Sequence, residues 1–199
     1  MAIAQTAIID KNAQVAHSAQ VWHHSQIREF AIIGKNTIIG KNVYIGARVE
    51  IGANCKIQNG AQIYEESIIE EGVFVGPGVV LTNDRYPRAV TPEENLKKLS
   101  DWTPQGVVVG KGSSIGANAT CVAPVKIGSW AVIGAGSVVT RNVQNYALAV
   151  GNPAKRIAWV GEFGVTLKDL GNSIYECPKT GKTYLENGDN LTPCDSQED

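Results

Sequence analysis

The sequence predicts an all-β fold, a left-handed parallel β-helix of hexapeptide repeats, and two observations carry that prediction. From Ile9 to Leu81, every sixth residue is Ile, Val or Leu, without a slip. Two positions before each of them lies a small or β-branched residue, such as Ala31 before Ile33. A period of six fits neither a helix, at about 3.6 residues per turn, nor a single strand, at about two. It is typical of triangular coils in which three short strands complete one turn.

The period also predicts where the side chains point. Residues eighteen apart should stack about 4.8 Å from each other, one strand spacing. The aliphatic residue then fills the interior, and its partner is small because a larger side chain would overpack a narrow prism. Glycine follows the aliphatic residue in several repeats, and we attribute it to the turn at each corner. These glycines are Gly34, Gly40, Gly46, Gly52 and Gly76.

One long insertion interrupts the repeats, which begin at Ala7. After Leu81 the next aliphatic residue in phase is Val109, which leaves 22 extra residues and an insertion at about residues 84–106. Long loops without structure of their own are usually functional or disordered, and Trp102 could anchor this one. We predict a β-helix domain over residues 1–157 and a capping extension over residues 158–199, with a short helix at 158–170 and a β-hairpin turning near Thr180.

Composition narrows the functional classes. The 199 residues carry a net charge of −1, which gives no general electrostatic case for nucleic-acid or membrane binding. The first residues show no basic, apolar leader, so we expect a cytoplasmic protein. Cys55 and Cys121 fall on interior repeat positions, where reduced thiols act as small apolar groups. The three histidines lie between residues 17 and 24 and no cysteine pair has ligand spacing, so we expect no metal site.

The known register places one polar corner beside the insertion. Arg28, Tyr64, Glu65 and Asn83 follow strands of the same face, and the long loop leaves from that corner. Gly46, between Arg28 and Tyr64, is expected to leave a notch. Polar groups gathered beside a long loop predict a binding site. The alternative is that they are solvated corner charges.

A basic pair lies where the chain leaves the prism. Lys155 and Arg156 follow a Gly-Asn-Pro-Ala segment at residues 151–154, and Arg141 lies above the same edge as Asn83. These cations could bind phosphates. The alternative is again a solvated pair that binds nothing.

Several segments resemble known enzymes. The repeats that end in Gly-Asn-Pro-Ala-Lys-Arg-Ile resemble hexapeptide-repeat acyltransferases. The resemblance is more specific for the bacterial nucleotide-sugar N-acetyltransferases, above all those acting on UDP-2-acetamido-3-amino-2,3-dideoxyglucuronate in surface-polysaccharide (lipopolysaccharide) synthesis. The segments that carry it are Val-Trp-His-His-Ser at 21–25, Cys-Lys-Ile-Gln-Asn at 55–59, Val-Phe-Val-Gly-Pro at 73–77, Leu-Thr-Asn-Asp at 81–84, Pro-Arg-Ala at 87–89 and Cys-Pro-Lys-Thr-Gly at 177–181.

The resemblance implies acetyl transfer from acetyl-CoA to the 3-amino group of a UDP-linked sugar acid, in a homotrimer with sites between subunits. It matches Asn83 to an asparagine that holds the sugar amine, and we expect Asp84 to hold the sugar or take the departing proton. The expected substrate-binding residues are His24, Arg28, Gln58, Asn59, Tyr64, Glu65, Arg85 and Arg88. The expected acetyl-CoA-binding residues are Ala123, Arg141, Asn152, Lys155, Arg156 and Ile157.

The histidine base of related dTDP-3-amino-sugar acetyltransferases has no match here, because no histidine follows His24. An amine with a pKa of about 7.7 to 8.0 is partly neutral at pH 7, so direct attack on the thioester is expected. Two alternatives remain open. One is an acyltransferase for a dTDP-3-amino-sugar or another small acceptor such as serine, and the other is a non-catalytic scaffold.

Overall fold

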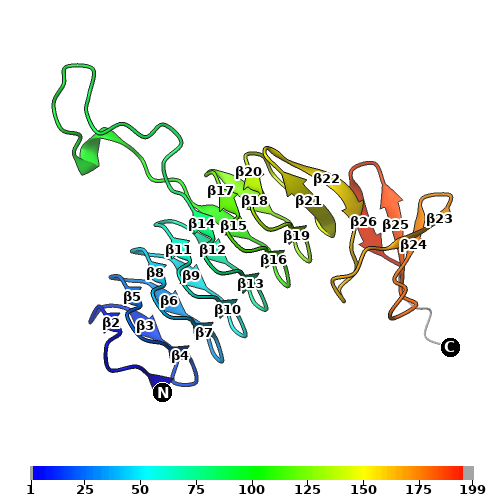
Figure 1. Ribbon diagram of the computed structural model, residues 1–199, viewed down its shortest axis with the longest axis horizontal. Helices are drawn as coiled ribbons and strands as arrows, with labels where there is room; N and C mark the ends of the chain where they lie inside the picture. Colours follow the sequence, from blue (N-terminus) through cyan, green and yellow to red (C-terminus); the bar gives the residue numbers. More distant parts are fainter. Residues whose placement is uncertain (1, 195–199) are drawn as a thin grey trace.

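The chain folds into a triangular prism of stacked coils, with one loop projecting from its side and a small sheet at its C-terminal end (Figure 1). The computed structural model describes residues 2–194. Each coil has three short parallel strands, one on each face of the prism. The predicted all-β, left-handed parallel β-helix is confirmed.

The three faces are parallel sheets that share one repeat. The first contains β1 (Ala2–Ile3), β4 (Gln20–Val21), β7 (Ile38–Ile39), β10 (Lys56–Ile57), β13 (Phe74–Val75), β16 (Ser114–Ile115), β19 (Val132–Ile133) and β21 (Ala147–Gly151), with β22 (Ala154–Trp159) antiparallel at its edge. The second contains β2 (Ile8–Ile9), β5 (Gln26–Ile27), β8 (Tyr44–Ile45), β11 (Gln62–Ile63), β14 (Val80–Leu81), β17 (Thr120–Cys121) and β20 (Val138–Val139). The third contains β3 (Gln14–Val15), β6 (Ile32–Ile33), β9 (Glu50–Ile51), β12 (Ile68–Ile69), β15 (Val107–Val109) and β18 (Val125–Ile127).

The strand register is the one that the six-residue period predicts. Ile45 pairs with Ile63, and Ile63 pairs with Leu81, so partners are eighteen residues apart. Leu81 then pairs with Cys121, which shows that the insertion adds residues without shifting the register. The repeating aliphatic side chains form one continuous buried core.

At some corners, the small residue two positions before the buried aliphatic residue forms a side-chain hydrogen bond. The Ser25 hydroxyl donates to the Gly40 carbonyl at 2.6 Å, and the Thr37 hydroxyl donates to the Gly52 carbonyl at 2.8 Å. Both side chains are fully buried, so these hydrogen bonds satisfy groups that water cannot reach.

The structure corrects our explanation of the corner glycines. A Cβ on Gly34 would lie 2.5 Å from the Gly52 carbonyl carbon, so glycine is required because the next coil passes too close. The positive φ of the turn falls two residues later, at Asn36 with φ 58°. Asn42 and Asn54 take the same conformation in later turns, which asparagine tolerates better than most residues.

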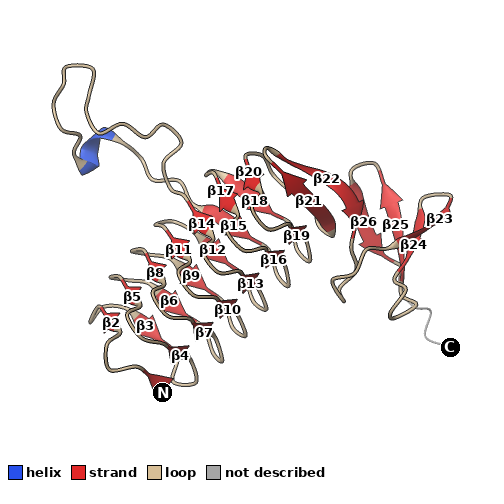
Figure 2. Ribbon diagram, viewed as in Figure 1, coloured by secondary structure: helices blue, strands red, loops and turns tan. Residues whose placement is uncertain are grey.

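The insertion lies between β14 and β15 and contains the single helix that the described residues form, the 3-10 helix η1 (Leu99–Asp101) (Figure 2). Val90 and Leu96 form an isolated antiparallel bridge within the loop. At its base, the Gln105 amide donates to the Asn83 carbonyl at 2.9 Å. The returning chain therefore lies beside the point where the loop departs.

The C-terminal extension is a sheet, and the predicted helix over residues 158–170 is wrong. Residues 160–167 form a turn between β22 and the next strand, because Gly164 takes a φ of 81° and Val160 bridges Thr166. The small antiparallel sheet contains β23 (Lys168–Gly171), β24 (Ile174–Glu176), β25 (Thr183–Asn187) and β26 (Asn190–Pro193). The predicted β-hairpin is confirmed, because β24 pairs antiparallel with β25.

Aromatic and aliphatic side chains attach this extension to the prism. Tyr146, Trp159, Leu167, Tyr184 and Leu191 are buried together. The predicted domain boundary at residue 157 falls inside β22, so the division of the chain into two units stays a prediction. Among residues 2–194, no helix has the length and apolarity needed to cross a membrane.

Candidate functional site

Four polar side chains meet at the corner from which the insertion departs. The Asn83 amide nitrogen donates to Glu65 Oε2 at 2.6 Å. The Tyr44 hydroxyl donates to the other oxygen, Glu65 Oε1, at 3.3 Å, and Arg28 reaches the same hydroxyl at 3.5 Å. Arg28, Glu65 and Asn83 follow β5, β11 and β14, and Tyr44 lies within β8, so stacking of the coils brings the four together.

A pocket of about 400 Å³ opens at this corner. Its prism side carries Arg28, Arg48 and Glu65, with Ala47 between them. The opposite side is Trp102 and Pro104, from the returning end of the insertion. The insertion therefore forms one wall of the pocket. Trp102, which we expected to anchor the loop, lines this pocket together with residues of the prism.

The arginines of this pocket already have acidic partners. Arg28 Nε and Nη2 donate to the two carboxylate oxygens of Glu29 at 2.7 and 2.8 Å. These hydrogen bonds raise the pKa of Arg28 and lower the pKa of Glu29. Arg48 pairs with Glu66 at 2.7 Å. Burial, and then the charge of Glu65, raise the pKa of Tyr44, which keeps its hydroxyl protonated as a donor.

The expected notch at Gly46 is wrong. Gly46 is buried, and a Cβ there would lie 2.8 Å from the Glu65 amide nitrogen and 3.1 Å from its carboxyl carbon. The missing side chain leaves room for the coil that carries Glu65 rather than for a ligand.

Three predicted residues lie in the insertion between β14 and β15. Asp84 Oδ1 accepts a hydrogen bond from the Tyr86 amide at 2.8 Å. Asp84 and Arg85 line a second pocket, of about 240 Å³, which shares Trp102 with the first. Arg88 is exposed and donates to the carbonyl of its neighbour Pro87.

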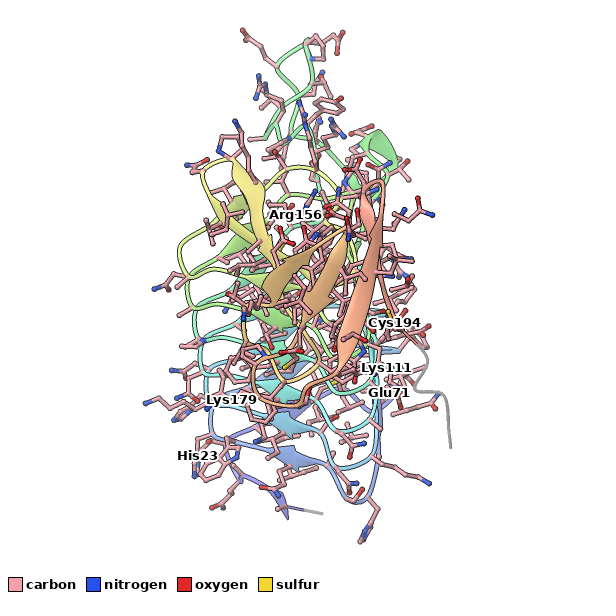
Figure 3. The ribbon with its side chains drawn as sticks, turned by 90° about the vertical axis from the view of Figure 1, so that its right-hand side faces the viewer. His23, Glu71, Lys111, Arg156, Lys179 and Cys194 are labelled. Carbon is pink, nitrogen blue, oxygen red and sulfur yellow. The ribbon has the colours of Figure 1, made fainter. Side chains whose placement is uncertain are left out.

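Three others lie along a different edge, the corner that follows β4 and β10. His24 is exposed there, and Gln58 and Asn59 line a pocket of about 410 Å³ beside Trp22. Figure 3 shows His23 on the side of the prism opposite Glu71 and Lys111, with the insertion above both. Because β4 and β10 belong to one face and β14 to another, these residues and Asn83 lie at different corners of the chain. Tyr64 does lie at the Asn83 corner, where its ring centroid is 5.4 Å from that of Tyr44.

The residues expected to bind acetyl-CoA spread over the last coils. Ala123 is buried, and its amide donates to the Thr82 hydroxyl at 3.0 Å. Arg141 is exposed at the same corner. Asn152 lies in the turn between β21 and β22, and Lys155 and Ile157 are exposed on β22.

Arg156 differs from its neighbours because the C-terminal extension holds it. Its guanidinium lies 4.0 Å from the ring centroid of Trp159. It also contacts Glu186 at 3.5 Å and Asp189 at 3.8 Å. Glu186 further accepts the Tyr175 hydroxyl at 2.7 Å and the Trp159 indole N–H at 2.9 Å. Of the expected basic pair, only Lys155 points outward without such a framework of contacts.

Tyr44 and Arg48 also belong to this corner, and neither was predicted from the sequence, although the repeat contained the signal for Tyr44. Tyr44 precedes the interior Ile45 by one position, which makes it an outward-facing strand residue one coil above Gln26. Counting eighteen residues along that face would have placed its ring beside the Arg28 corner. Among residues 2–194, no group of three or more His, Cys, Asp or Glu side chains is placed to hold a metal ion.

Comparison with known families identifies the class of repeat. Residues 30–64 and 48–83 match the bacterial transferase hexapeptide (six repeats), and residues 106–141 match the hexapeptide repeat of succinyl-transferase. These matches lie on both sides of the insertion. Residues 30–83 and 106–141 are therefore similar to the hexapeptide repeats of transferases.

Particular relatives are acetyltransferases. Over 78 residues the chain is 47% identical to the dTDP-3-amino-3,6-dideoxy-alpha-D-galactopyranose 3-N-acetyltransferase of Aneurinibacillus thermoaerophilus. That match covers 39% of each chain, so the chain spans well under half of this relative.

Solved structures share the fold. The product of the BC4754 gene of Bacillus cereus superposes with a TM-score of 0.61 at 22% identity, over 79% of this chain and 86% of that one. PerB from Caulobacter crescentus, solved with CoA and GDP-perosamine, gives a TM-score of 0.51 at 22% identity, over 77% of this chain and 55% of that one.

Proposed function

We propose that this protein is an acetyl-CoA-dependent N-acetyltransferase that acts on the 3-amino group of a nucleotide-linked sugar. The observation that carries the proposal is the Asn83 amide at 2.6 Å from the Glu65 carboxylate, beside a pocket walled by the insertion. An amide and a carboxylate side by side suit recognition of an amine. The N-acetyltransferase relative, at 47% identity over 78 residues, supports the same reaction.

The reaction we propose is direct attack. The neutral amine of the acceptor forms a bond with the carbonyl carbon of the acetyl thioester, and the C–S bond then breaks to release CoA. The nitrogen loses one proton, which finally resides on the departing sulfur. Asn83 orients the amine, and a backbone N–H of the coil stabilises the oxyanion. Catalysis then comes mainly from holding the two substrates in line.

For the acceptor we propose UDP-2-acetamido-3-amino-2,3-dideoxyglucuronate. Arg28 and Arg48 line the pocket and are suited to its carboxylate or diphosphate. Exposed Lys155 and Arg141 are suited to the phosphates of acetyl-CoA, whereas the contacts of Arg156 with Trp159 and Glu186 favour a supporting role. A second candidate, a dTDP-3-amino-sugar, is favoured by the name of the relative.

We further propose a homotrimer. His24, Gln58 and Asn59 lie on a different edge from Asn83 within one chain. In a trimer with sites between subunits, that edge of one prism would face the Asn83 corner of its neighbour, and both sets could serve one site. A cytoplasmic role in surface-polysaccharide synthesis accords with such an acceptor.

The test is release of free thiol from acetyl-CoA in the presence of three separate acceptors: the UDP-linked 3-amino uronic acid, a dTDP-linked 3-amino-6-deoxyhexose and serine. We expect thiol with the UDP sugar alone. Release with another acceptor would replace the proposed substrate but keep the reaction class. No release with any acceptor, together with no binding of acetyl-CoA, would favour a non-catalytic scaffold.

A further inference from the structure

The Asn83 corner has one carboxylate whose charge is not neutralised. Arg28 is paired with Glu29 and Arg48 is paired with Glu66. Within residues 2–194, Glu65 has no cationic nitrogen within 4.0 Å. Its partners are an amide and a phenol, both of which are neutral. The group that completes this corner should therefore be a cation.

Glu65 is also held in place. The two neutral donors bind different oxygens, Asn83 at Oε2 and Tyr44 at Oε1, so the carboxylate cannot rotate freely. Gly46 packs against its backbone and carboxyl carbon from the coil below. Each carboxylate oxygen has capacity for a further hydrogen bond, and Glu65 lines the pocket. A preorganised carboxylate of this kind can receive an N–H group from a ligand.

We propose that Glu65 binds the amino group of the acceptor and takes its proton during transfer, so that the corner selects amines over hydroxyls. This inference rests on the proposed acetyl transfer at this corner. It assigns the proton transfer to Glu65 in place of Asp84, whose carboxylate bonds to the Tyr86 amide inside the insertion.

The chemistry explains why a carboxylate is sufficient. When a neutral amine attacks a thioester, positive charge appears on the nitrogen as the N–C bond forms. A carboxylate at that point stabilises the charge where it develops. It then accepts the N–H proton, and the proton passes to the sulfur that leaves when the C–S bond breaks. A hydroxyl acceptor is a weaker nucleophile and has to lose its proton as it attacks, which usually needs a dedicated base such as histidine.

The decisive variant is Glu65→Gln, which keeps an acceptor for the Asn83 amide but removes the charge. The matched control is Glu71→Gln, on the edge where Glu71 pairs with Lys111 at 2.5 Å (Figure 3). We expect Glu65→Gln to lower kcat/KM with the amino sugar about 100-fold, a typical general-base effect. We expect Glu71→Gln to leave it unchanged.

Binding measurements distinguish recognition of the amine from a purely structural role of Glu65, because a structural role would not change the preference for the amine over the hydroxyl. Affinities are measured for the UDP-linked 3-amino uronic acid and for UDP-N-acetylglucosaminuronate, which carries a hydroxyl at the same carbon. The wild type should prefer the amine about tenfold, as expected for a hydrogen bond to a charged group. Glu65→Gln should lose this preference and still bind the hydroxyl sugar normally.

The outcomes separate this inference from the proposed function. An equal loss of both ligands in Glu65→Gln, or a preference for the amine that survives the substitution, would overturn the role of Glu65. If Asn83→Ala nevertheless abolished transfer, the proposed function would stand without a role for Glu65. If the wild type transferred acetyl to no amine, the proposed function would fail first, and with it the inference.

Discussion

Two edges of this prism are built from the same repeat and carry their polar groups differently. On the edge that follows β6 and β9, side chains satisfy one another, as where the Asn36 amide donates to Asn54 Oδ1 at 3.1 Å. On the edge that follows β11 and β14, the Asn83 amide donates to a carboxylate that lacks a cationic partner in the described chain, and the insertion lines the pocket beside it. Because the backbone is equivalent at both edges, this difference points to function rather than to folding.

The largest effect we predict distinguishes the amides of the two edges. Asn83→Ala should lower the rate of acetyl transfer at least about 100-fold, as loss of a preorganised polar contact does in other enzymes. The control is Asn145→Ala, which removes a hydrogen bond of 2.9 Å to the Ser129 amide at the other edge. Steady-state thiol release measures both variants. Equal activity in the two would show that the Asn83 corner has no catalytic role.

The next prediction tests a feature that both edges share, a glycine where successive coils pass close to each other. Gly34→Ala and Gly46→Ala should each reduce the free energy of unfolding by about 1–3 kcal/mol, the usual cost of overpacking, because the added Cβ meets the next coil. Urea unfolding followed by circular dichroism measures both. Gly46→Ala should also lower activity, because Glu65 is the residue it displaces. A stable Gly46→Ala variant would refute our explanation of these glycines.

The smallest effect concerns the ion pairs of the two edges. Glu29→Gln should raise KM for the nucleotide sugar about fivefold, the coupling expected of neighbouring charges, because Arg28 loses its orienting partner. Glu71→Gln, which removes the partner of Lys111, should leave KM unchanged.

The pH dependence follows from the lowered pKa of Glu29, whose main cause is hydrogen bonding from Arg28. The pair contributes fully above the ordinary carboxyl pKa of about 4.3, and its contribution is lost as pH falls through the lowered value. The affinity of the wild type for UDP-N-acetylglucosaminuronate, whose hydroxyl does not titrate in this range, should therefore stay constant from pH 8 to about pH 5. A weakening of this affinity across the range in the wild type, absent from Glu29→Gln, would contradict the role of the pair.

The repeat allowed much of the site to be predicted. Arg28, Tyr64, Glu65 and Asn83 follow strands of one face, and the structure does place them at one corner. Tyr44 was not predicted because we considered only residues at the corners. Its position within a strand was nevertheless fixed by the same register. Asp84 was paired with Asn83 by adjacency in the sequence. In the folded chain it turns into the loop, because its carboxylate bonds to the Tyr86 amide.

The sequence by itself determined the prism, its register and its interior, because a period of six sets the inward side chains locally and eighteen-residue stacking repeats the same contact. Only the tertiary structure decided how Trp102 walls the pocket, and that residues 158–170 become strand and turn against Tyr146 and Tyr184. It also decided that Arg156 is held by Trp159 and Glu186. These contacts join segments that follow no common period, so their partners depend on how the whole chain packs.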